Sequence, residues 1–358
     1  MIIRLTTYKR SKDIPPLPGN DVFHSTALFQ IFEQTSGYSP TLLVASDNGT
    51  PIAKMLCITR RSFRLPTIAD RTYVYGVGEY FLPASPDDAP NKRKIEQEQI
   101  FNEMLTYLTQ KLDVHAFTLE FRNIEEPLFG YRYFRENGYF PMRWLRVRNS
   151  IHHNAIDKWM SNSRKRQIQR GLKNGSVISI AQTRDEVTEF FTMLKKYYSS
   201  KINHHLPDLK FFISLLEHPE GERFGKIYLV KLKDKIIGGS VCLFSKDTSY
   251  LMFSAGLRKS YPLNYPGVLC IWGAMTDARQ RGFEHFEFID AGLPFANYGY
   301  RDFILRFGGK QMSTRRWYKL RWNWLNKLLI KIYVYPHTSL LMHGVQIIAM
   351  VQTNHCDG

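Results

Sequence analysis

The sequence predicts an α/β (α+β) fold made by tandem duplication of one module, a mixed sheet with flanking helices. The first sign is a repeated pentapeptide: GYRYF at residues 130–134 returns as GYRDF at residues 299–303. Each copy follows the same predicted series of hairpin, strand, helix and strand, and such agreement in order is hard to attribute to chance. At 358 residues the chain is also long for a single hydrophobic core, so two modules fit its length.

Each module is predicted to start its sheet with a hairpin. Residues 43–58 form two apolar runs joined by an Asn-Gly pair, which is typical of a tight hairpin turn. Residues 229–243 repeat this plan with a shorter connection. When the second strands of the two hairpins are aligned, Cys57 falls opposite Cys242, so we expect the hairpins to be equivalent.

The next elements are predicted from aromatic strands and from apolar residues at helical spacing. They are a strand at 73–80, a helix at 95–112 and a strand at 116–121 in the first module, and a strand at 250–257, a helix at 268–278 and a strand at 285–290 in the second. Helical segments precede the hairpins at 22–35, 185–202 and 209–217. The predicted division is a first module at 1–152, a second module at 153–320 and an amphipathic helical tail at 321–358.

The chain is strongly basic. Its 49 Lys and Arg against 32 Asp and Glu give a formal net charge of +17. This charge favours a polyanionic partner, such as tRNA, an anionic membrane surface or a phosphate-bearing precursor. Hydrophobic residues make up 44% of the chain, which excludes a disordered protein. The start of the chain lacks a long apolar segment, so we expect a cytoplasmic protein.

Cysteine and histidine spacing predicts no metal site. Four cysteines are widely separated and form no Cys-x-x-Cys pair, so we expect reduced, buried thiols. They are Cys57, Cys242, Cys270 and Cys356. The adjacent His204 and His205 have no third ligand at a suitable spacing. The sequence also contains no P-loop and no dinucleotide-binding fingerprint.

The predicted order of elements resembles that of the GNAT acyltransferase superfamily. Two such modules in tandem, with a basic helix opening the second, resemble its FemAB-like branch. The stretches that carry the resemblance are a basic, glycine-terminated helix (SRKRQIQRGLKNG, 163–175), a strand, helix and strand (250–256, 265–272 and 288–292) and a closing segment (300–309). The resemblance extends over about residues 20–320.

The resemblance implies an enzyme that passes an aminoacyl or acyl group from an activated donor to an amine, on a cell-wall (peptidoglycan) precursor or a lipid-linked substrate. The implied donor is either an aminoacyl-tRNA or a thioester of CoA or an acyl carrier, and no tightly bound cofactor is implied. The second module would bind the donor and catalyse the reaction, and the first would be vestigial. The segment that corresponds to the family's glycine-rich pyrophosphate turn, residues 258–267, holds a single glycine here.

One face of the basic helix is the predicted phosphate site. Arg166, Arg170 and Lys173 share a helical face that suits a phosphate or pyrophosphate group, and a solvated basic helix is the alternative interpretation. The predicted phosphate-binding residues of this segment are Arg164, Arg166, Arg170 and Lys173. The resemblance places Tyr265 and Gly267 in the turn whose backbone amides hold the pyrophosphate.

Asp290 is the predicted catalytic base. It ends a strand, and the resemblance places it where GNAT folds separate a pair of strands to admit the acyl group. Acyl transfer to an amine requires the loss of a proton, which Asp290 would accept directly or through a water. On turn preferences alone, Asp290 would instead cap the following turn.

The closing loop supplies the other predicted site residues. Tyr298, a second candidate for catalysis, would line the donor or acceptor channel together with Tyr300 and Arg301. The same GYR sequence occurs in the first module, however, so a structural role is the alternative interpretation. In that role the tyrosines pack and the arginine pairs with a carboxylate.

The tail contains an amphipathic helix at residues 322–332. Its predicted apolar face consists of Trp322, Leu325, Leu328, Leu329 and Ile332, and its polar face of Asn323, Asn326, Lys327 and Lys331. The helix either docks on the second module or rests on an anionic membrane, which would place the protein at the inner membrane face. For the whole chain, the alternative to an enzyme is a non-catalytic module that binds RNA or an anionic membrane surface. The sequence leaves the oligomeric state open.

Overall fold

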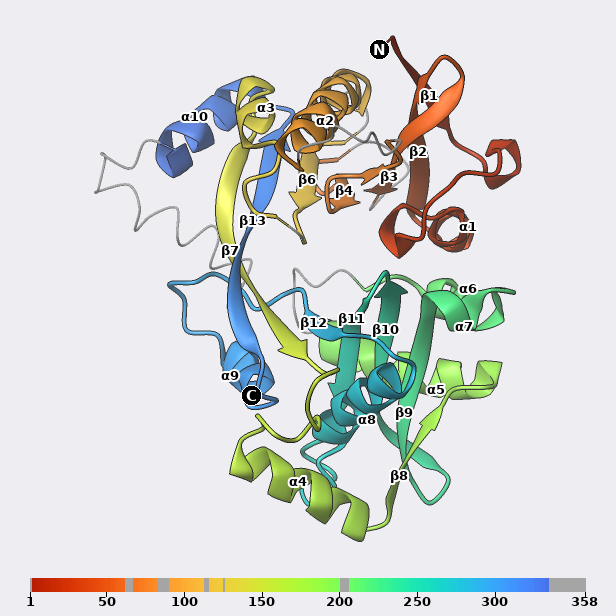
Figure 1. The fold of residues 1–358 in the computed structure, drawn as a ribbon. Coiled ribbons are helices and arrows are strands. Elements are labelled where there is room, and N and C mark those ends of the chain that lie inside the picture. Colours follow the sequence, from red (N-terminus) through yellow and green to blue (C-terminus); the bar gives the residue numbers. More distant parts are fainter. Residues whose placement is uncertain are drawn as a thin grey trace. The chain divides into compact units, whose positions relative to one another are not determined.

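The computed structural model describes residues 2–61, 67–82, 90–112, 116–124, 126–199 and 206–334. These residues divide into two compact units (Figure 1). The first unit holds the described residues up to Arg143 together with those from Thr314 on, and the second holds Trp144–Ser313. The units thus divide the chain at other positions than the predicted modules. His204, His205 and Cys356 lie outside the described residues.

The first unit has a mixed sheet flanked by helices. Its strands are β1 (Ile3–Tyr8), β2 (Tyr38–Asp47), β3 (Thr50–Arg60), β4 (Arg71–Tyr75), β5 (Glu79–Tyr80), β6 (Thr118–Arg122) and most of β13 (Lys310–Leu320). Its helices are η1 (Ser11–Asp13), η2 (Val22–His24), α1 (Thr26–Gln34), α2 (Pro90–Leu112), α3 (Tyr131–Glu136) and α10 (Asn323–Val334). The strands lie in the order β1-β2-β3-β4-β6-β13, and β5 pairs with β3.

The second unit repeats this architecture. Its strands are most of β7 (Phe140–Ser150), β8 (Ser176–Ile180), β9 (Gly225–Leu232), β10 (Lys235–Ser245), β11 (Thr248–Gly256) and β12 (His285–Phe288). Its helices are α4 (Asn162–Lys173), α5 (Arg184–Ser199), α6 (Leu209–Glu217), α7 (Gly221–Phe224), α8 (Pro266–Gln280) and α9 (Gly299–Leu305). The strands lie in the order β7-β12-β11-β10-β9-β8.

The duplicated α/β module that the sequence predicts is confirmed. The hairpin β2-β3 corresponds to β9-β10, and the parallel pair β4 and β6 corresponds to the parallel pair β11 and β12. Cys57 is the eighth of the 11 residues of β3, and Cys242 is the eighth of the 11 residues of β10. Both thiols are buried and free, as is that of Cys270.

Each unit contains the last strand of the other module. β7 follows the first module along the chain but pairs antiparallel with β12. β13 follows the second module but pairs antiparallel with β6. This exchange of strands explains why the units do not coincide with the predicted modules. The sequence reading includes neither β7 nor β13.

A buried glutamate meets arginines of the exchanged strand in each unit. In the second unit, Arg146 Nη1 on β7 lies 2.7 and 3.0 Å from the two carboxylate oxygens of Glu287 on β12. In the first unit, Arg316 Nη1 on β13 lies 3.6 Å from Glu120 Oε1 on β6. Glu287 is 0% and Glu120 1% exposed, so each carboxylate depends on its arginines for compensation.

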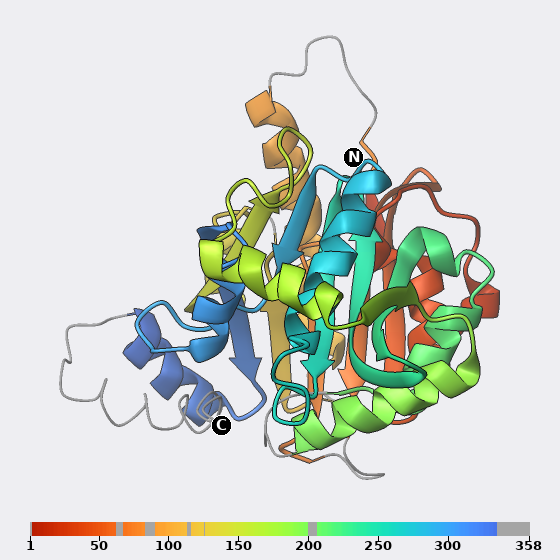
Figure 2. The same cartoon turned by 90° about the horizontal axis from the view of Figure 1, so that it is seen from below.

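Helices α8 and α5 cover opposite faces of the second sheet (Figures 1 and 2). Gly238 and Gly239 are successive residues of β10 and therefore point to opposite faces. A Cβ on Gly238 would lie 2.9 Å from Pro266 Cβ at the start of α8, and a Cβ on Gly239 would lie 2.6 Å from the Phe190 ring of α5. Both helices thus approach the β10 backbone closely.

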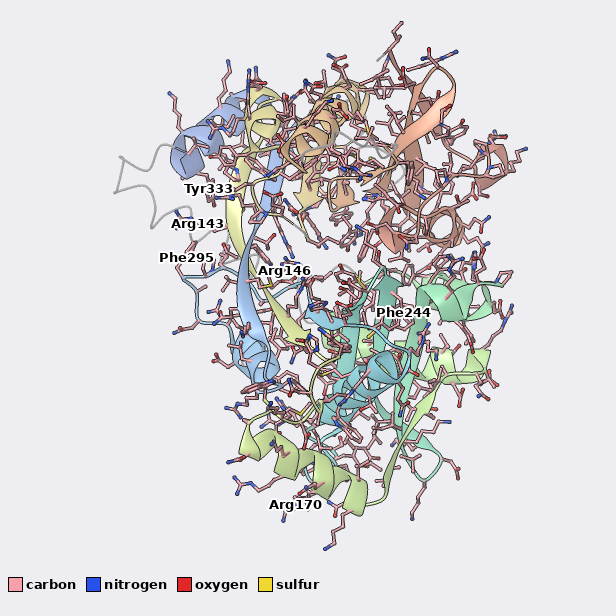
Figure 3. All side chains as sticks on the ribbon, viewed as in Figure 1. Arg143, Arg146, Arg170, Phe244, Phe295 and Tyr333 are labelled. Carbon is pink, nitrogen blue, oxygen red and sulfur yellow. The ribbon has the colours of Figure 1, made fainter. Side chains whose placement is uncertain are left out.

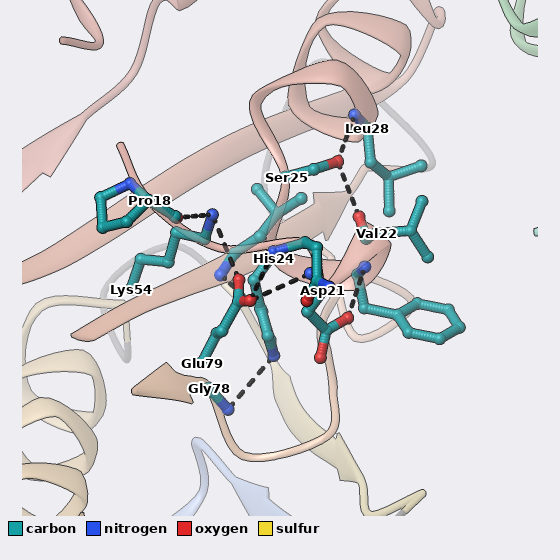
Figure 4. A network of polar contacts seen from close by, with 12 residues as sticks. Pro18, Asp21, Val22, His24, Ser25, Leu28, Lys54, Gly78 and Glu79 are labelled. Atoms are coloured by element: carbon teal, nitrogen blue, oxygen red, sulfur yellow. Dashed lines mark hydrogen bonds and ion pairs between the residues drawn. The ribbon is translucent and has the colours of Figure 1, made fainter. Parts of the chain in front are cut away.

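A buried ion pair fastens residues 18–25 to the first sheet (Figure 4). Lys54 Nζ on β3 lies 3.2 Å from Glu79 Oε2 on β5 and donates to the Pro18 carbonyl at 2.7 Å. Glu79 Oε1 accepts hydrogen bonds from the backbone N–H groups of Asn20 and Asp21, at 2.8 and 3.0 Å. These charges are compensated within the unit, which marks the network as structural.

The two GYR segments form short helices, α3 and α9, where the second was expected to be a loop. A glycine with left-handed backbone follows each helix: Gly138 has φ 78° and Gly308 has φ 90°. Glycine adopts this conformation without steric cost, which ends the helix and turns the chain into the next strand. The recurrence of GYR and glycine therefore reflects one structural unit used twice.

Helix α10 docks on the first unit, so the prediction that it docks on the second module is wrong. Asn326 Oδ1 accepts a hydrogen bond from the Leu320 N–H, and its Nδ2 donates to the Gly138 carbonyl, both at 2.9 Å. These bonds turn Asn326 inward, and Leu328 is exposed, so these two residues lie on the faces opposite to those predicted. Ile332 is buried, and Asn323, Lys327 and Lys331 are exposed, as predicted. None of the helices in the described part of the chain is long and apolar enough to cross a membrane.

Candidate functional site

The two parallel strands of the second sheet diverge before β11 ends. Their pairing runs from Thr248 with His285 to Leu251 with Phe288. β12 ends at Phe288, whereas β11 continues to Gly256. The segment of β11 beyond Leu251 and the chain after Phe288 form what we call the strand parting.

A bulge in β11 explains where this pairing stops. β10 pairs Val241 with Phe253 and Cys242 with Leu251, so Met252 is an extra residue on β11. A bulge bends its strand and increases the local twist, and it leaves the extra residue outside the ladder. The bulge in β11 thus directly follows Leu251, its last residue paired with β12.

The first unit lacks this arrangement at the equivalent place. β4 and β6 stay in register to Tyr75 and Arg122, the last residues of both strands. The Gly76 N–H then donates to the Arg122 carbonyl at 2.8 Å, which continues the contact beyond β4. The expectation that the first module is vestigial remains a prediction, and this closed strand pair supports it.

A carboxylate and a neutral phenol lie at the strand parting. Asp290 Oδ1 accepts a hydrogen bond from the indole Nε1–H of Trp144 at 3.0 Å. The Tyr300 hydroxyl hydrogen-bonds with the Ser254 side chain of β11. Burial raises the pKa of the Tyr300 hydroxyl, and the nearby Tyr198 and Asp290 raise it further. Tyr300 is therefore protonated near neutral pH and can donate a proton or a hydrogen bond.

Tyr298 and Arg301 hold the loop between β12 and α9. A Cβ on Gly292 would lie 2.8 Å from the Tyr298 ring, so the ring covers that glycine. Arg301 donates to the carbonyls of Leu293 and Ala296, both at 2.6 Å. Arg301 thus binds backbone carbonyls, not a carboxylate as in the alternative interpretation, and its geometry favours a positioning role.

The N-terminus of α8 lies against the end of β11. Tyr265 caps the helix in a left-handed conformation with φ 48°, and its carbonyl accepts from the Val268 and Leu269 N–H groups. Gly256 touches the first turn of α8, since a Cβ there would lie 2.4 Å from the Gly267 nitrogen. The positive end of the helix dipole is thereby placed next to the strand parting.

Gly256→Ala should lower the free energy of unfolding by about 1–3 kcal/mol, because the added methyl group would collide with the α8 backbone. Gly267→Ala is the matched control, since a Cβ there would meet no atom within 4 Å among the described residues. Chemical denaturation of both variants measures the difference. Equal stability of the two would contradict the close approach of α8 to β11.

The four predicted phosphate-binding residues of α4 differ in exposure: one is buried and three are exposed. The Arg164 guanidinium lies 4.4 and 4.3 Å from the ring centres of Phe303 and Phe307 and donates to the Phe303 carbonyl at 2.6 Å. Burial, and then the charge of Arg306, lowers the pKa of Arg164 to about 10. This 1% exposed side chain has a structural environment. The exposed residues are Arg166, Arg170 and Lys173.

The C-terminal end of α4 packs against the loop before α8. Gly171 permits this contact, because a Cβ there would lie 2.5 Å from the Asn264 carbonyl oxygen. Asn174 Nδ2 donates to the Leu263 carbonyl at 2.8 Å. Arg170 and Lys173 flank this contact, and Arg170 projects from the outer side of α4 (Figure 3). The two cations are therefore neighbours in sequence of the residues that contact the loop before α8.

One group of side chains in the described part of the chain has metal-ligand spacing. Ligand atoms of Asp247, Glu284 and His285 lie within 4.8 Å of one another. They sit at the start of β12, whereas Asp290 follows its end. Burial, and then Arg148, lowers the pKa of His285. We assign no metal to this group, because exposed acidic side chains often cluster without an ion.

Sequence reasoning misses Trp144 and Ser254. Trp144 is 146 positions from Asp290, so no local pattern could associate the two. Ser254 lies in a predicted strand, but its role depends on the bulge at Met252, which shifts the register of β11. In the sequence, only its place in the strand before the predicted pyrophosphate turn could have indicated Ser254.

The chain is similar to known proteins over a portion of its sequence and in its fold. Residues 160–300 match the family model described as an acetyltransferase (GNAT) domain. No curated protein matches the chain in sequence. Similar solved structures include FemX, L-PGS from Bacillus licheniformis and a tandem GNAT protein from the clavulanic acid biosynthesis pathway.

These structures are distant in sequence but cover most of the chain. FemX shares 12% identity at a TM-score of 0.59, over 88% of this chain and 95% of that one. L-PGS shares 11% at 0.53, over 88% and 91%, and the tandem GNAT protein shares 8% at 0.51, over 89% and 99%. The predicted tandem GNAT-like fold is confirmed.

Proposed function

We propose that this chain, which has the tandem GNAT fold of the FemAB-like proteins and matches a GNAT acetyltransferase domain at residues 160–300, transfers an aminoacyl or acyl group to an amine. The observation that carries the proposal is the strand parting in the second unit. There, a bulge ends the parallel pairing, and a carboxylate and a protonated phenol lie beside the N-terminus of a helix. This is an arrangement for holding an activated acyl group between two strands.

The side chains at the strand parting suit each step of acyl transfer. The amine nitrogen attacks the acyl carbonyl carbon, a C–N bond forms, and the C–O or C–S bond to the donor breaks. Asp290, or a water that it orients, accepts the proton that the amine loses. The Tyr300 hydroxyl protonates the leaving oxygen or sulfur. The backbone N–H of the bulged Met252 stabilises the oxyanion of the tetrahedral intermediate.

The proposed donor is anionic. The N-terminus of α8 presents backbone N–H groups and a positive dipole end, which attract phosphate. The exposed Arg258 and Lys259 follow β11 after Leu257, and the exposed Arg170 and Lys173 are sequence neighbours of Gly171 and Asn174, by which α4 contacts the same loop. Both an aminoacyl-tRNA and a CoA or acyl-carrier thioester carry phosphate groups. The acceptor is an amine, on a cell-wall precursor or a lipid-linked substrate.

Reversing the charges of Arg170 and Lys173 should weaken donor binding by at least tenfold at low salt. If the donor is a tRNA, the slope of log affinity against log salt should also fall by about one for each lost phosphate contact. The matched control reverses two exposed cations elsewhere on the second unit, Arg184→Glu with Arg223→Glu. Equal donor affinities of the double variant and the wild type would show that Arg170 and Lys173 do not contribute to donor binding.

Product formation tests the proposal itself. The purified full chain is incubated with a labelled aminoacyl-tRNA or a labelled acyl thioester and an amine acceptor, and label on the acceptor is counted. Transfer from either donor supports an acyltransferase. Donor binding without transfer from any donor would instead favour the non-catalytic module that binds RNA.

A further inference from the structure

One face of α10 combines exposed tryptophan and lysine. Trp324, Lys327, Leu328 and Lys331 follow each other at i, i+3, i+4 and i+7 and therefore share this face. Trp324 is 66% and Leu328 43% exposed. Trp322, which precedes the helix and is 47% exposed, stacks beside Trp324 with ring centres 6.2 Å apart and also packs edge-on against Phe117. We call these five residues the α10 outer face.

Contacts on the other side of the helix fix this orientation. Asn326 forms hydrogen bonds to the backbone of Leu320 and Gly138. Tyr333 stacks on Phe140 with ring centres 5.5 Å apart. Leu328 and Trp324 therefore cannot turn inward without breaking buried hydrogen bonds, which would leave polar groups unpaired. The outer face is a fixed feature of the first unit.

Along the sequence, the charged residues of this helix and of the segments next to it have one sign. Residues 303–356 contain eight Lys and Arg and no Asp or Glu. Within this stretch lie Arg321, Lys327 and Lys331, which are all exposed. A partner for the outer face must therefore supply negative charge to the lysines and an apolar environment to the tryptophans and Leu328.

We propose that the α10 outer face binds an anionic lipid bilayer, with the helix lying in the plane of the interface. Tryptophan rings and leucine enter the boundary between headgroups and acyl chains, while lysines at the same level attract anionic headgroups. A nucleic acid would engage the lysines but would give Leu328 no apolar environment. This inference does not depend on the proposed reaction, since α10 belongs to the first unit and the strand parting to the second.

Vesicle binding by the purified full chain tests this inference. We expect the chain to co-sediment with vesicles of phosphatidylglycerol and phosphatidylcholine but not with pure phosphatidylcholine. Lys327→Ala and Lys331→Ala should each lower the affinity about fivefold. Trp324→Ser should lower it at least tenfold, and the blue shift of tryptophan emission on binding should be smaller in this variant than in the wild type.

Trp159→Ser is the matched control, because Trp159 is 62% exposed on the second unit. It should bind anionic vesicles like the wild type, and all variants should keep the wild-type melting temperature. Equal binding to neutral vesicles, or unchanged binding by Trp324→Ser, would overturn the proposal. Failure to bind anionic vesicles would also overturn it. In that case tRNA binding, or a dimer that is lost in Trp324→Ser, would identify a different partner for this face.

Discussion

Asp290→Asn is expected to lower the turnover of acyl transfer by about 100-fold, the smaller end of what a positioned general base contributes. The asparagine oxygen can still accept the hydrogen bond from Trp144 Nε1, so the loop should keep its position and the protein its stability. Steady-state rates and thermal denaturation of the same preparations measure both effects. A variant with wild-type turnover would remove Asp290 from the catalytic machinery.

Two tyrosine variants separate catalysis from packing at the same site. Tyr300→Phe removes the hydroxyl that bonds to Ser254 and should reduce turnover, with little change in donor affinity. Tyr298→Phe keeps the ring that covers Gly292 and should leave turnover within about threefold of wild type if its role is packing. A larger loss of turnover in Tyr298→Phe than in Tyr300→Phe would indicate that Tyr298 is the catalytic tyrosine.

Glu120→Gln is expected to destabilise the first unit by about 3–5 kcal/mol at pH 7, because it leaves the buried Arg316 and the partly buried Arg71 and Arg122 without their counter-charge. Burial alone would raise the pKa of the Glu120 carboxyl, but Arg122, Arg316 and Arg71 outweigh it and lower the pKa from 4.5 to about 2. This lowering corresponds to roughly 3 kcal/mol of stability.

The pH dependence of that loss has a definite sign. A carboxyl whose pKa is lowered on folding stabilises the protein fully above the unfolded pKa of 4.5, and it loses this contribution as the pH falls toward 2. The difference in free energy of unfolding between wild type and Glu120→Gln should therefore shrink over this range. Glu136→Gln, at an exposed pair with Arg132, is the control and should cost less than about 1 kcal/mol. A pH-independent difference would contradict the buried ion network.

The duplication is predictable from the sequence because its signals are local. An Asn-Gly turn, helical spacing of apolar residues and a glycine after GYR each act within a few residues, and they recur in the same order. Cys57 and Cys242 accordingly occupy equivalent positions in β3 and β10. The exchange of β7 and β13 is not predictable in this way, because the residues of a strand do not specify locally which distant strand it pairs with.

The candidate site is predictable only where a residue's role depends on its own element. Asp290 follows β12 as expected, but Trp144 joins it through the exchanged strand β7. Spacing alone assigns Arg164 to the same basic run as Arg166, although only Arg164 is buried between phenylalanines. Likewise, hydropathy places Leu328 inward on α10, whereas the hydrogen bonds of Asn326 decide the orientation.

Binding of the purified full chain to a CoA thioester and, separately, to an aminoacyl-tRNA, each across a salt series, tests donor recognition by the second unit most directly. Transfer of the labelled group to an amine is followed in the same samples. We predict saturable binding of one donor, weakened by salt and by charge reversal of Arg170 and Lys173, with transfer that falls about 100-fold in Asp290→Asn. Binding of neither donor, or binding of either with no transfer by the wild type, would contradict the proposed acyltransferase.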